Sequence, residues 1–113
     1  HILEHLPFSA LIQLLDESLR VLTSGGIAIF ETPNPENLMV GSCNFYTDPT
    51  HRNPIPPHTL SFMLTQRGFV ETTVLQFSPL ASSQDIKVID PELRQVVERY
   101  YKEQDYAVIG KKF

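Results

Sequence analysis

The residues best suited to chemistry lie in three short segments, the first of which opens the sequence. There, His5 places an imidazole directly after the carboxylate of Glu4, and His1 precedes them. Imidazole titrates near neutral pH, so His5 can accept a proton from a hydroxyl group. The alternative is structural, because a backbone carbonyl can equally satisfy a histidine ring.

His1, Glu4 and His5 also spell the pattern H-x-x-E-H. Inverted zinc metalloproteases use this pattern to bind a metal with two histidines, while a helix-borne glutamate acts on the metal-bound water. Pro7, however, disrupts the helix that would have to present the ligands, and no third ligand follows in a suitable context. We therefore expect no metal site and no protease in this segment.

Asn34 stands in the second segment, where Glu31-Thr32-Pro33-Asn34 follows the apolar run Ile27-Ala28-Ile29-Phe30. Such a run of β-branched and aromatic residues predicts a strand buried on both faces of a parallel sheet. Open α/β sheets bind their ligands at the carboxyl ends of strands, so Asn34 is placed to orient a substrate by hydrogen bonds. The alternative is a turn, since asparagine between two prolines favours one.

A proline-rich stretch between Thr32 and His58 holds the third segment. It contains six of the nine prolines, which predicts an ordered binding loop without helix or strand: Pro33, Pro35, Pro49, Pro54, Pro56 and Pro57. Within it, Asp48 and His51 are spaced so that one turn can bring carboxylate and imidazole together as an orienting pair at the substrate. The alternative is an Asx-turn formed by Asp48. Tyr46 can stack on a ligand or pack the loop.

Helices and strands alternate around these segments, which predicts an α/β fold. Helices are expected where apolar residues recur every three or four positions: Phe8–Leu22, a short helix around Leu60–Leu64 that Pro57 or Thr59 begins and Gly68 ends, and a helix opened by Asp90-Pro91. Strands are expected at Ile27–Phe30, Val70–Phe77 and Tyr106–Ile109. Three strands make a small sheet.

The 113 residues form one domain at most, and their composition excludes several classes of protein. With a net charge of −4 and no basic stripe, nucleic acid is not an expected partner. No apolar run is long enough for a membrane span, and no secretion signal opens the chain. Cys43 is the single cysteine, so an intrachain disulfide is ruled out and a cytoplasmic location is expected.

Two motifs flank the first expected helix: Ile2-Leu3-Glu4-His5-Leu6 before it and Arg20-Val21-Leu22-Thr23-Ser24-Gly25-Gly26 after it. Their order resembles the region after the fourth strand of Rossmann-like S-adenosylmethionine-dependent methyltransferases, in which the glycine turn leads into the fifth strand. Ser24 stands where the family usually has proline, while the two glycines that shape the turn are kept. A helix closing on Arg67-Gly68-Phe69 extends the resemblance toward the end of the chain.

This resemblance implies a fold, a chemistry and a role for each segment. The chain would form the last three strands of the methyltransferase sheet, with the final strand antiparallel between the other two, so residues 1–113 are expected to be its carboxyl-terminal half. His1 would lie beside the cofactor, with Glu4 or His5, the expected catalytic residues, facing the substrate. Phe45–His51 and Pro54–Pro57 look most like bacterial methyltransferases of O-antigen polysaccharide, which implies O-methylation of a saccharide or another small hydroxylated acceptor.

One part of the family pattern is missing from the 113 residues. The turn G-x-G, through which the backbone approaches the cofactor, occurs nowhere, and neither does the acidic residue that binds the ribose. We therefore expect the isolated chain to be inactive and not to bind S-adenosylmethionine tightly. The alternative is a non-catalytic binding or assembly module that retains half of the methyltransferase fold. Because Ile27–Phe30 would lack a neighbouring strand, we also expect self-association through the exposed sheet edge.

Overall fold

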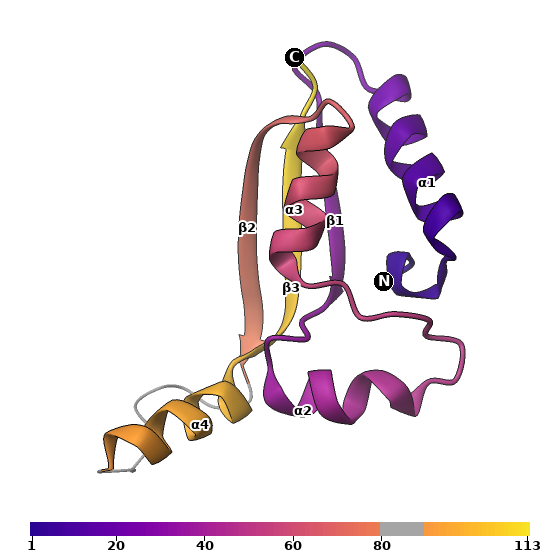
Figure 1. The fold of residues 1–113 in the computed structure, drawn as a ribbon. Helices are drawn as coiled ribbons and strands as arrows, with labels where there is room; N and C mark the ends of the chain where they lie inside the picture. Colours follow the sequence, from indigo (N-terminus) through magenta and orange to yellow (C-terminus); the bar gives the residue numbers. More distant parts are fainter. Residues whose placement is uncertain (80–89) are drawn as a thin grey trace.

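The computed structural model describes residues 1–79 and 90–113. Its helices and strands follow in the order η1 (Leu3–His5), α1 (Phe8–Val21), β1 (Ile27–Pro33), α2 (Leu38–Ser42), η2 (Asn44–Thr47), α3 (Pro57–Gln66), β2 (Val70–Pro79), α4 (Pro91–Tyr101) and β3 (Glu103–Lys111), as Figure 1 shows. Each segment that the sequence predicts as a helix or strand forms that element, with ends that differ by a few residues.

The three strands form one sheet in the order β1-β3-β2. β3 lies between the other two and runs antiparallel to both, so that Ile109 stands opposite Ile29 on one side and Thr73 on the other. β1 and β2 therefore point in the same direction, and the chain passes from one to the other through α3. This arrangement confirms the expected α/β fold and the expected place of the final strand.

The prediction that Ile27–Phe30 is buried on both faces of a parallel sheet is wrong. β1 pairs with an antiparallel strand, and burial alternates along it: Phe30 is 8% exposed, whereas Ile27 is 55% and Ile29 is 61% exposed. The reason is that the buried core of the described residues lies on only one face of the sheet. An apolar run does not reveal which of its two faces will be covered.

The hydrophobic core lies between this face of the sheet and the helices α1 and α3. Its buried side chains come from both helices, from the strands and from the turn after α3: Leu11, Leu15, Phe30, Leu60, Leu64, Phe69, Tyr106 and Val108. Phe30 and Phe69 meet edge to face with their ring centroids 5.9 Å apart. Full burial of an apolar side chain of this size contributes roughly 1.5–3 kcal/mol, so these residues hold both helices on the sheet.

Tyr106 ties the proline-rich segment to this core. Its ring is fully buried, and its hydroxyl donates a hydrogen bond of 2.5 Å to the carbonyl of Ile55. Burial raises the pKa of this hydroxyl, and the carboxylates of Glu36 and Glu4 raise it further. The hydroxyl therefore stays protonated and keeps its role as donor.

The proline-rich stretch 32–58 contains more regular structure than the sequence predicts. The short helices α2 and η2 lie inside it, in the interval between Pro35 and Pro49 that holds no proline. Asn37 starts α2, because its side-chain oxygen accepts a hydrogen bond of 3.0 Å from the amide of Val40. The prolines therefore bound these helices and do not exclude them.

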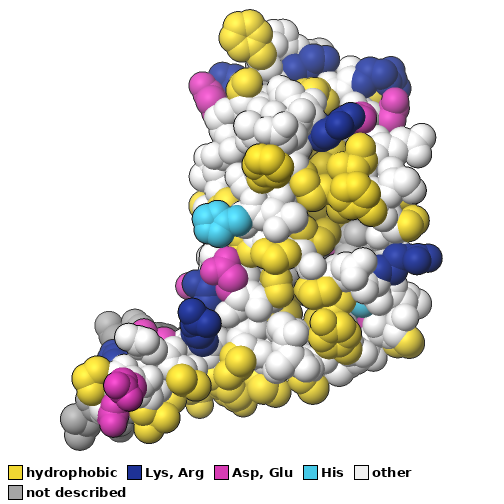
Figure 2. Space-filling model, in the orientation of Figure 1, with side chains coloured by type: hydrophobic (Ala, Val, Ile, Leu, Met, Phe, Trp, Pro, Cys, Tyr) yellow, Lys and Arg dark blue, Asp and Glu magenta, His cyan; other side chains and the backbone are white. Residues whose placement is uncertain are grey.

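α4 differs from the other helices because none of its residues is buried. Leu93, Val96 and Tyr100 are exposed on it, and Figure 2 shows hydrophobic groups over this helix at the lower left. α4 therefore adds little to the core. Across residues 1–79 and 90–113, no helix has both the length and the apolar character needed to cross a membrane.

β1 is an edge strand of the described sheet, and we predict that the 113-residue chain self-associates through it. Ile27 and Ile29 are exposed on this strand, and the backbone N–H and C=O groups along its outer edge pair with no other strand of the described sheet. A second copy of the chain can form hydrogen bonds with these groups. Sedimentation velocity at micromolar concentrations should show a dimer that dissociates on dilution.

Two lysine variants locate the contact. Ile29→Lys should shift the equilibrium to monomer, because a lysine on an edge strand disfavours pairing. Phe62→Lys, at an exposed position of α3, is the matched control and should leave the dimer unchanged. A wild-type chain that stays monomeric at every concentration would contradict the prediction.

An ion pair joins α1 to the end of α3, where Arg67 donates hydrogen bonds of 2.7 Å from Nε and Nη2 to Asp16. These bonds hold the pKa of the Asp16 carboxyl below its usual value. The stabilisation is thus fully present at neutral pH and is lost as the pH falls through the lowered pKa. We predict that Asp16→Asn lowers the melting temperature at neutral pH and that the difference vanishes well below the ordinary Asp pKa of about 3.9. A difference that persists in strong acid would exclude the ion pair as its source.

Candidate functional site

Glu4 lies at the centre of a polar cluster and is almost completely buried, with 1% of its surface exposed. It belongs to η1, which is a single short turn and not an α-helix, as Pro7 predicts. The backbone becomes extended at Leu6, directly after His5. The amide of Arg52 donates a hydrogen bond of 2.7 Å to the carbonyl of Glu4, which fixes the proline-rich segment against η1.

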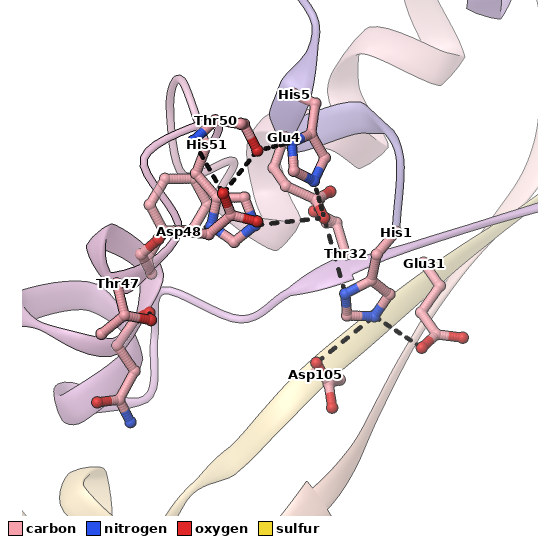
Figure 3. A network of polar contacts seen from close by, with 12 residues as sticks. His1, Glu4, His5, Glu31, Thr32, Thr47, Asp48, Thr50, His51 and Asp105 are labelled. Carbon is pink, nitrogen blue, oxygen red and sulfur yellow. Dashed lines mark hydrogen bonds and ion pairs between the residues drawn. The ribbon is translucent and has the colours of Figure 1, made fainter.

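The two oxygens of the Glu4 carboxylate have different surroundings, as Figure 3 shows. Oε2 accepts a hydrogen bond of 2.8 Å from the hydroxyl of Thr32, a fully buried residue of β1. Oε1 is buried and accepts no hydrogen bond from any residue that the structure describes. Three histidine nitrogens face it, at 3.7 Å for His1 Nδ1, 3.7 Å for His5 Nε2 and 4.0 Å for His51 Nε2. A buried carboxylate oxygen without a donor is costly, so Oε1 marks the centre of the candidate site.

The ring of His51 is held in one orientation. Its Nδ1 lies 2.5 Å from the carbonyl oxygen of Phe45 and must donate to it, because a carbonyl only accepts. The buried ring of Phe45 also packs against the imidazole, with the centroids 4.5 Å apart. In a neutral His51 the proton is thus on Nδ1, and the Nε2 that faces Glu4 carries a lone pair.

Thr50 and Asp48 orient the ring of His5 in a similar way. The Thr50 hydroxyl donates a hydrogen bond of 2.6 Å to Asp48 Oδ1, and its oxygen lies 2.9 Å from His5 Nδ1. The hydroxyl and the amide of Thr50 hold the pKa of the Asp48 carboxyl below its usual value, so Asp48 is an acceptor. His5 Nδ1 therefore donates to Thr50, and Nε2 of a neutral His5 directs its lone pair toward Glu4.

His1 lies on the side of the cluster formed by the strands. Its Nε2 is 2.8 Å from Glu31 Oε1 on β1 and 3.6 Å from Asp105 Oδ1 on β3, while its Nδ1 faces Glu4. Burial raises the pKa of the Asp105 carboxyl, and the charge of Glu31 raises it further. Acidic side chains of two adjacent strands thus orient His1.

The structure brings together most of the residues that the sequence selects, namely His1, Glu4, His5, Asp48 and His51. Asp48 forms both arrangements that the sequence suggests, the Asx-turn and the pair with His51. One oxygen forms the Asx-turn with the amide of Thr50 at 2.8 Å, and the other lies 3.6 Å from His51 Nε2. The proline-rich segment therefore supplies a preformed carboxylate–imidazole pair.

Asn34 and Tyr46 take no part in this network of contacts. Asn34 is fully buried, and its Nδ2 donates to Gln76 Oε1 and to the carbonyl of Glu103, while its Oδ1 accepts from the amide of Glu36. The structure thus gives Asn34 the turn role and leaves it no free donor for a substrate, which corrects the substrate role that the sequence suggests. Tyr46 is 58% exposed, so its ring is open to contact from solvent.

Thr32 and Thr50 are members of the site to which the sequence assigns no role. Thr32 lies 28 positions from Glu4, and Thr50 lies 45 positions from His5, so their contacts depend on the tertiary fold. A local signal exists only for Thr50, because a threonine two residues after an aspartate suits an Asx-turn. Nothing in the sequence around Thr32 indicates its contact with Glu4.

Comparison with known proteins identifies the class to which this fold corresponds. The chain is similar to a crystal structure of an S-adenosylmethionine-dependent methyltransferase from Archaeoglobus fulgidus, with a TM-score of 0.82 and 32% sequence identity. The match covers 99% of this chain and 56% of that protein, so the chain spans little more than half the length of its relative. No protein-family model matches the sequence, and no curated protein was found that matches it.

This similarity confirms the methyltransferase fold that the motifs around η1 and the turn Gly25-Gly26 imply. It also supports a methyltransferase as the general class of protein. In this fold the Glu4 carboxylate and the histidines around it lie at the carboxyl end of β1, beside Glu31 and Thr32. That edge is where open α/β sheets bind their ligands.

We predict that Thr32→Val lowers the free energy of unfolding by about 1–3 kcal/mol, because it leaves Glu4 Oε2 buried without its donor. Thr73→Val, at an exposed position of β2, is the matched control and should change stability by less than about 0.5 kcal/mol. Urea denaturation of the two variants measures both values. Equal stabilities would mean that Thr32 does not satisfy the carboxylate.

Proposed function

We propose that this chain is the acceptor-binding part of an S-adenosylmethionine-dependent O-methyltransferase. The observation that carries the proposal is the group of Glu4, His5 and His51 at the carboxyl end of β1, in a chain with a methyltransferase fold. We call these three residues the Glu4 cluster. An unprotonated imidazole beside a buried carboxylate is suited to take a proton from a hydroxyl group.

In the proposed reaction, an oxygen of the acceptor attacks the methyl carbon of S-adenosylmethionine in line with the carbon–sulfur bond. The new oxygen–carbon bond forms as the carbon–sulfur bond breaks, and S-adenosylhomocysteine leaves as a neutral thioether. The hydroxyl proton passes to His5 Nε2, and Glu4 stabilises the resulting positive charge from 3.7 Å. His5 is thus the proposed base, and Glu4 is its electrostatic partner.

The proposed acceptor is a saccharide or another small hydroxylated molecule. The side chain of His5 is 33% exposed, so a hydroxyl group can reach it. The exposed ring of Tyr46 offers an apolar face on which a sugar can stack. Asp48 and His51, whose Oδ2 and Nε2 lie 3.6 Å apart, are the residues that we propose to bind neighbouring hydroxyl groups. The resemblance of Phe45–His51 to O-antigen methyltransferases supports this class of acceptor.

S-adenosylmethionine is the proposed methyl donor, with His1 beside it at the carboxyl end of β1. The side chain of His1 is 37% exposed while its ring is fixed by Glu31, which leaves it accessible to a ligand. The 113 residues contain no G-x-G turn. We therefore propose the activity for a protein in which such a cofactor-binding half is joined to these residues, and we expect the 113-residue chain alone to be inactive.

We predict that His5→Ala lowers kcat by roughly 10²–10⁴-fold in the complete methyltransferase while the affinity for S-adenosylmethionine changes little. The reason is that the alanine removes the base but leaves the cofactor contacts. Transfer of a labelled methyl group to a panel of oligosaccharides and nucleotide sugars measures kcat. His58→Ala removes an exposed imidazole of α3 and is the matched control with unchanged kcat.

Two results would change this assignment. An unaltered kcat in His5→Ala would return His5 to a structural role. A folded complete protein that transfers no methyl group to any acceptor would instead favour a non-catalytic binding module with the same fold.

A further inference from the structure

We propose that the Glu4 cluster binds a divalent transition-metal ion such as Zn²⁺, Mn²⁺ or Co²⁺. Glu4, His5 and His51 each offer one ligand atom, and these atoms lie within 4.8 Å of one another. We assign them as Glu4 Oε1, His5 Nε2 and His51 Nε2, because these atoms face one another across the cluster. The pattern H-x-x-E-H indicates no metal site by itself, because it lacks a helix and a third ligand. The structure supplies the third ligand from the proline-rich segment, where His51 turns toward η1 (Figure 3).

The Nδ1 atoms of His5 and His51 are engaged in hydrogen bonds, so that the Nε2 atom of each ring faces the Glu4 carboxylate with a lone pair. His51 Nδ1 donates to a backbone carbonyl and His5 Nδ1 donates to Thr50, so Nε2 of either neutral ring carries no proton. Both Nε2 atoms face Glu4 Oε1, a buried oxygen that receives no hydrogen bond from the described residues. These three atoms thus bring lone pairs close together, an arrangement that a positive charge between them would stabilise.

A protonated ring of His1, His5 or His51 would also supply positive charge, but the distances oppose it. A charge-assisted hydrogen bond from an imidazolium to a carboxylate is about 2.7–2.9 Å long. The distances to Glu4 Oε1 are 3.7 Å from His1 Nδ1, 3.7 Å from His5 Nε2 and 4.0 Å from His51 Nε2, which is too long for such bonds. Atoms that each bind a metal at about 2.0–2.2 Å are separated by roughly 3–4 Å, so these distances suit a shared ion.

The type of ligand selects the class of ion. Two imidazoles with one carboxylate occur at zinc, manganese and non-haem iron sites, whereas Mg²⁺ and Ca²⁺ favour oxygen ligands. His5 Nδ1 donates to the hydroxyl of Thr50, which in turn donates to Asp48. Hydrogen bonds of this kind, made by the ring nitrogen that does not bind the metal, orient a metal-binding histidine. Three protein ligands also leave coordination positions free for a substrate oxygen.

The consequence for the reaction rests on the proposed function. If His5 Nε2 binds the ion, its lone pair is no longer free to accept the hydroxyl proton. The ion would instead act as a Lewis acid: it would lower the pKa of an acceptor hydroxyl bound to it, so that water could take the proton, and it would help to position the oxygen near the methyl carbon. The proposed enzyme would then depend on the metal.

Titration with Co²⁺ tests the site on the full 113-residue chain. The protein carries Cys43→Ser, which removes an exposed thiol that can compete for the ion, and no polyhistidine tag. After treatment with a chelator and dialysis, Co²⁺ is added and the visible absorption of bound Co²⁺ is followed. We expect saturable bands at one ion per chain, which Zn²⁺ removes in competition.

Variants assign the ligands. Glu4→Gln and His51→Ala should each weaken binding at least tenfold, and Thr50→Val should weaken it roughly 10–100-fold by releasing the ring of His5. Thr50 is exposed, so this variant keeps the test valid if the substitution of the buried glutamate impairs folding. His58→Ala is the matched control, because it removes an exposed imidazole of α3 and should leave binding unchanged. Circular dichroism checks that each variant is folded.

The outcomes separate the metal site from the proposed function. Absence of saturable Co²⁺ bands, or binding that persists in both folded His51→Ala and Thr50→Val, overturns the metal site. Methyl transfer by the complete protein that withstands chelation also overturns it, while retaining the enzyme. Metal binding that follows the pattern above supports the site even if no methyl transfer is found.

Discussion

Burial of the Glu4 carboxylate is the constraint on which the arrangement of the site depends. A carboxylate with 1% exposure is stable in a protein interior only when hydrogen bonds or positive charge replace its water. Thr32 donates a hydrogen bond to one oxygen, and the imidazoles of His1, His5 and His51 surround the other. Three segments must therefore meet at one point: η1, the carboxyl end of β1 and the proline-rich stretch.

The proline-rich stretch reaches this point because both of its ends are tied to residues at or near β3. At one end, Asn37 Nδ2 donates a hydrogen bond of 2.6 Å to the carbonyl of Lys102, the residue before β3. At the other end, the hydroxyl of Tyr106 donates to the carbonyl of Ile55. The position of His51 between these ties thus depends on the last strand of the sheet, although the two are far apart in the sequence. Folding of β3 and assembly of the site are coupled for this reason.

The elements are largely predictable from the sequence because their signals are local. Asp90 caps α4 with its side chain, and Gly68 ends α3 with a φ of +108° that other residues rarely adopt. The sequence also reveals which residues are chemically suited to a site. It does not reveal their partners, because Thr32 contacts Glu4 only after the sheet and η1 have packed together. The exposure of one face of β1 is not predicted either, because an apolar run such as Ile27–Phe30 is expected both for a strand buried on one face and for a strand buried on two. The place of β3 follows from the family resemblance and not from any periodicity.

β1 links the open edge of the sheet to the candidate site. Its side chains alternate, so Thr32 points with Phe30 toward the core and Glu4, while Glu31 points with Ile27 and Ile29 toward the exposed face. A segment that covers this face or pairs with this edge must pass beside Glu31, whose carboxylate binds His1. Burial of the two isoleucines contributes roughly 1.5–3 kcal/mol each. In the proposed enzyme, the same apolar contact that completes the sheet would therefore bring the cofactor-binding half to His1, so that cofactor and acceptor meet only in the complete fold.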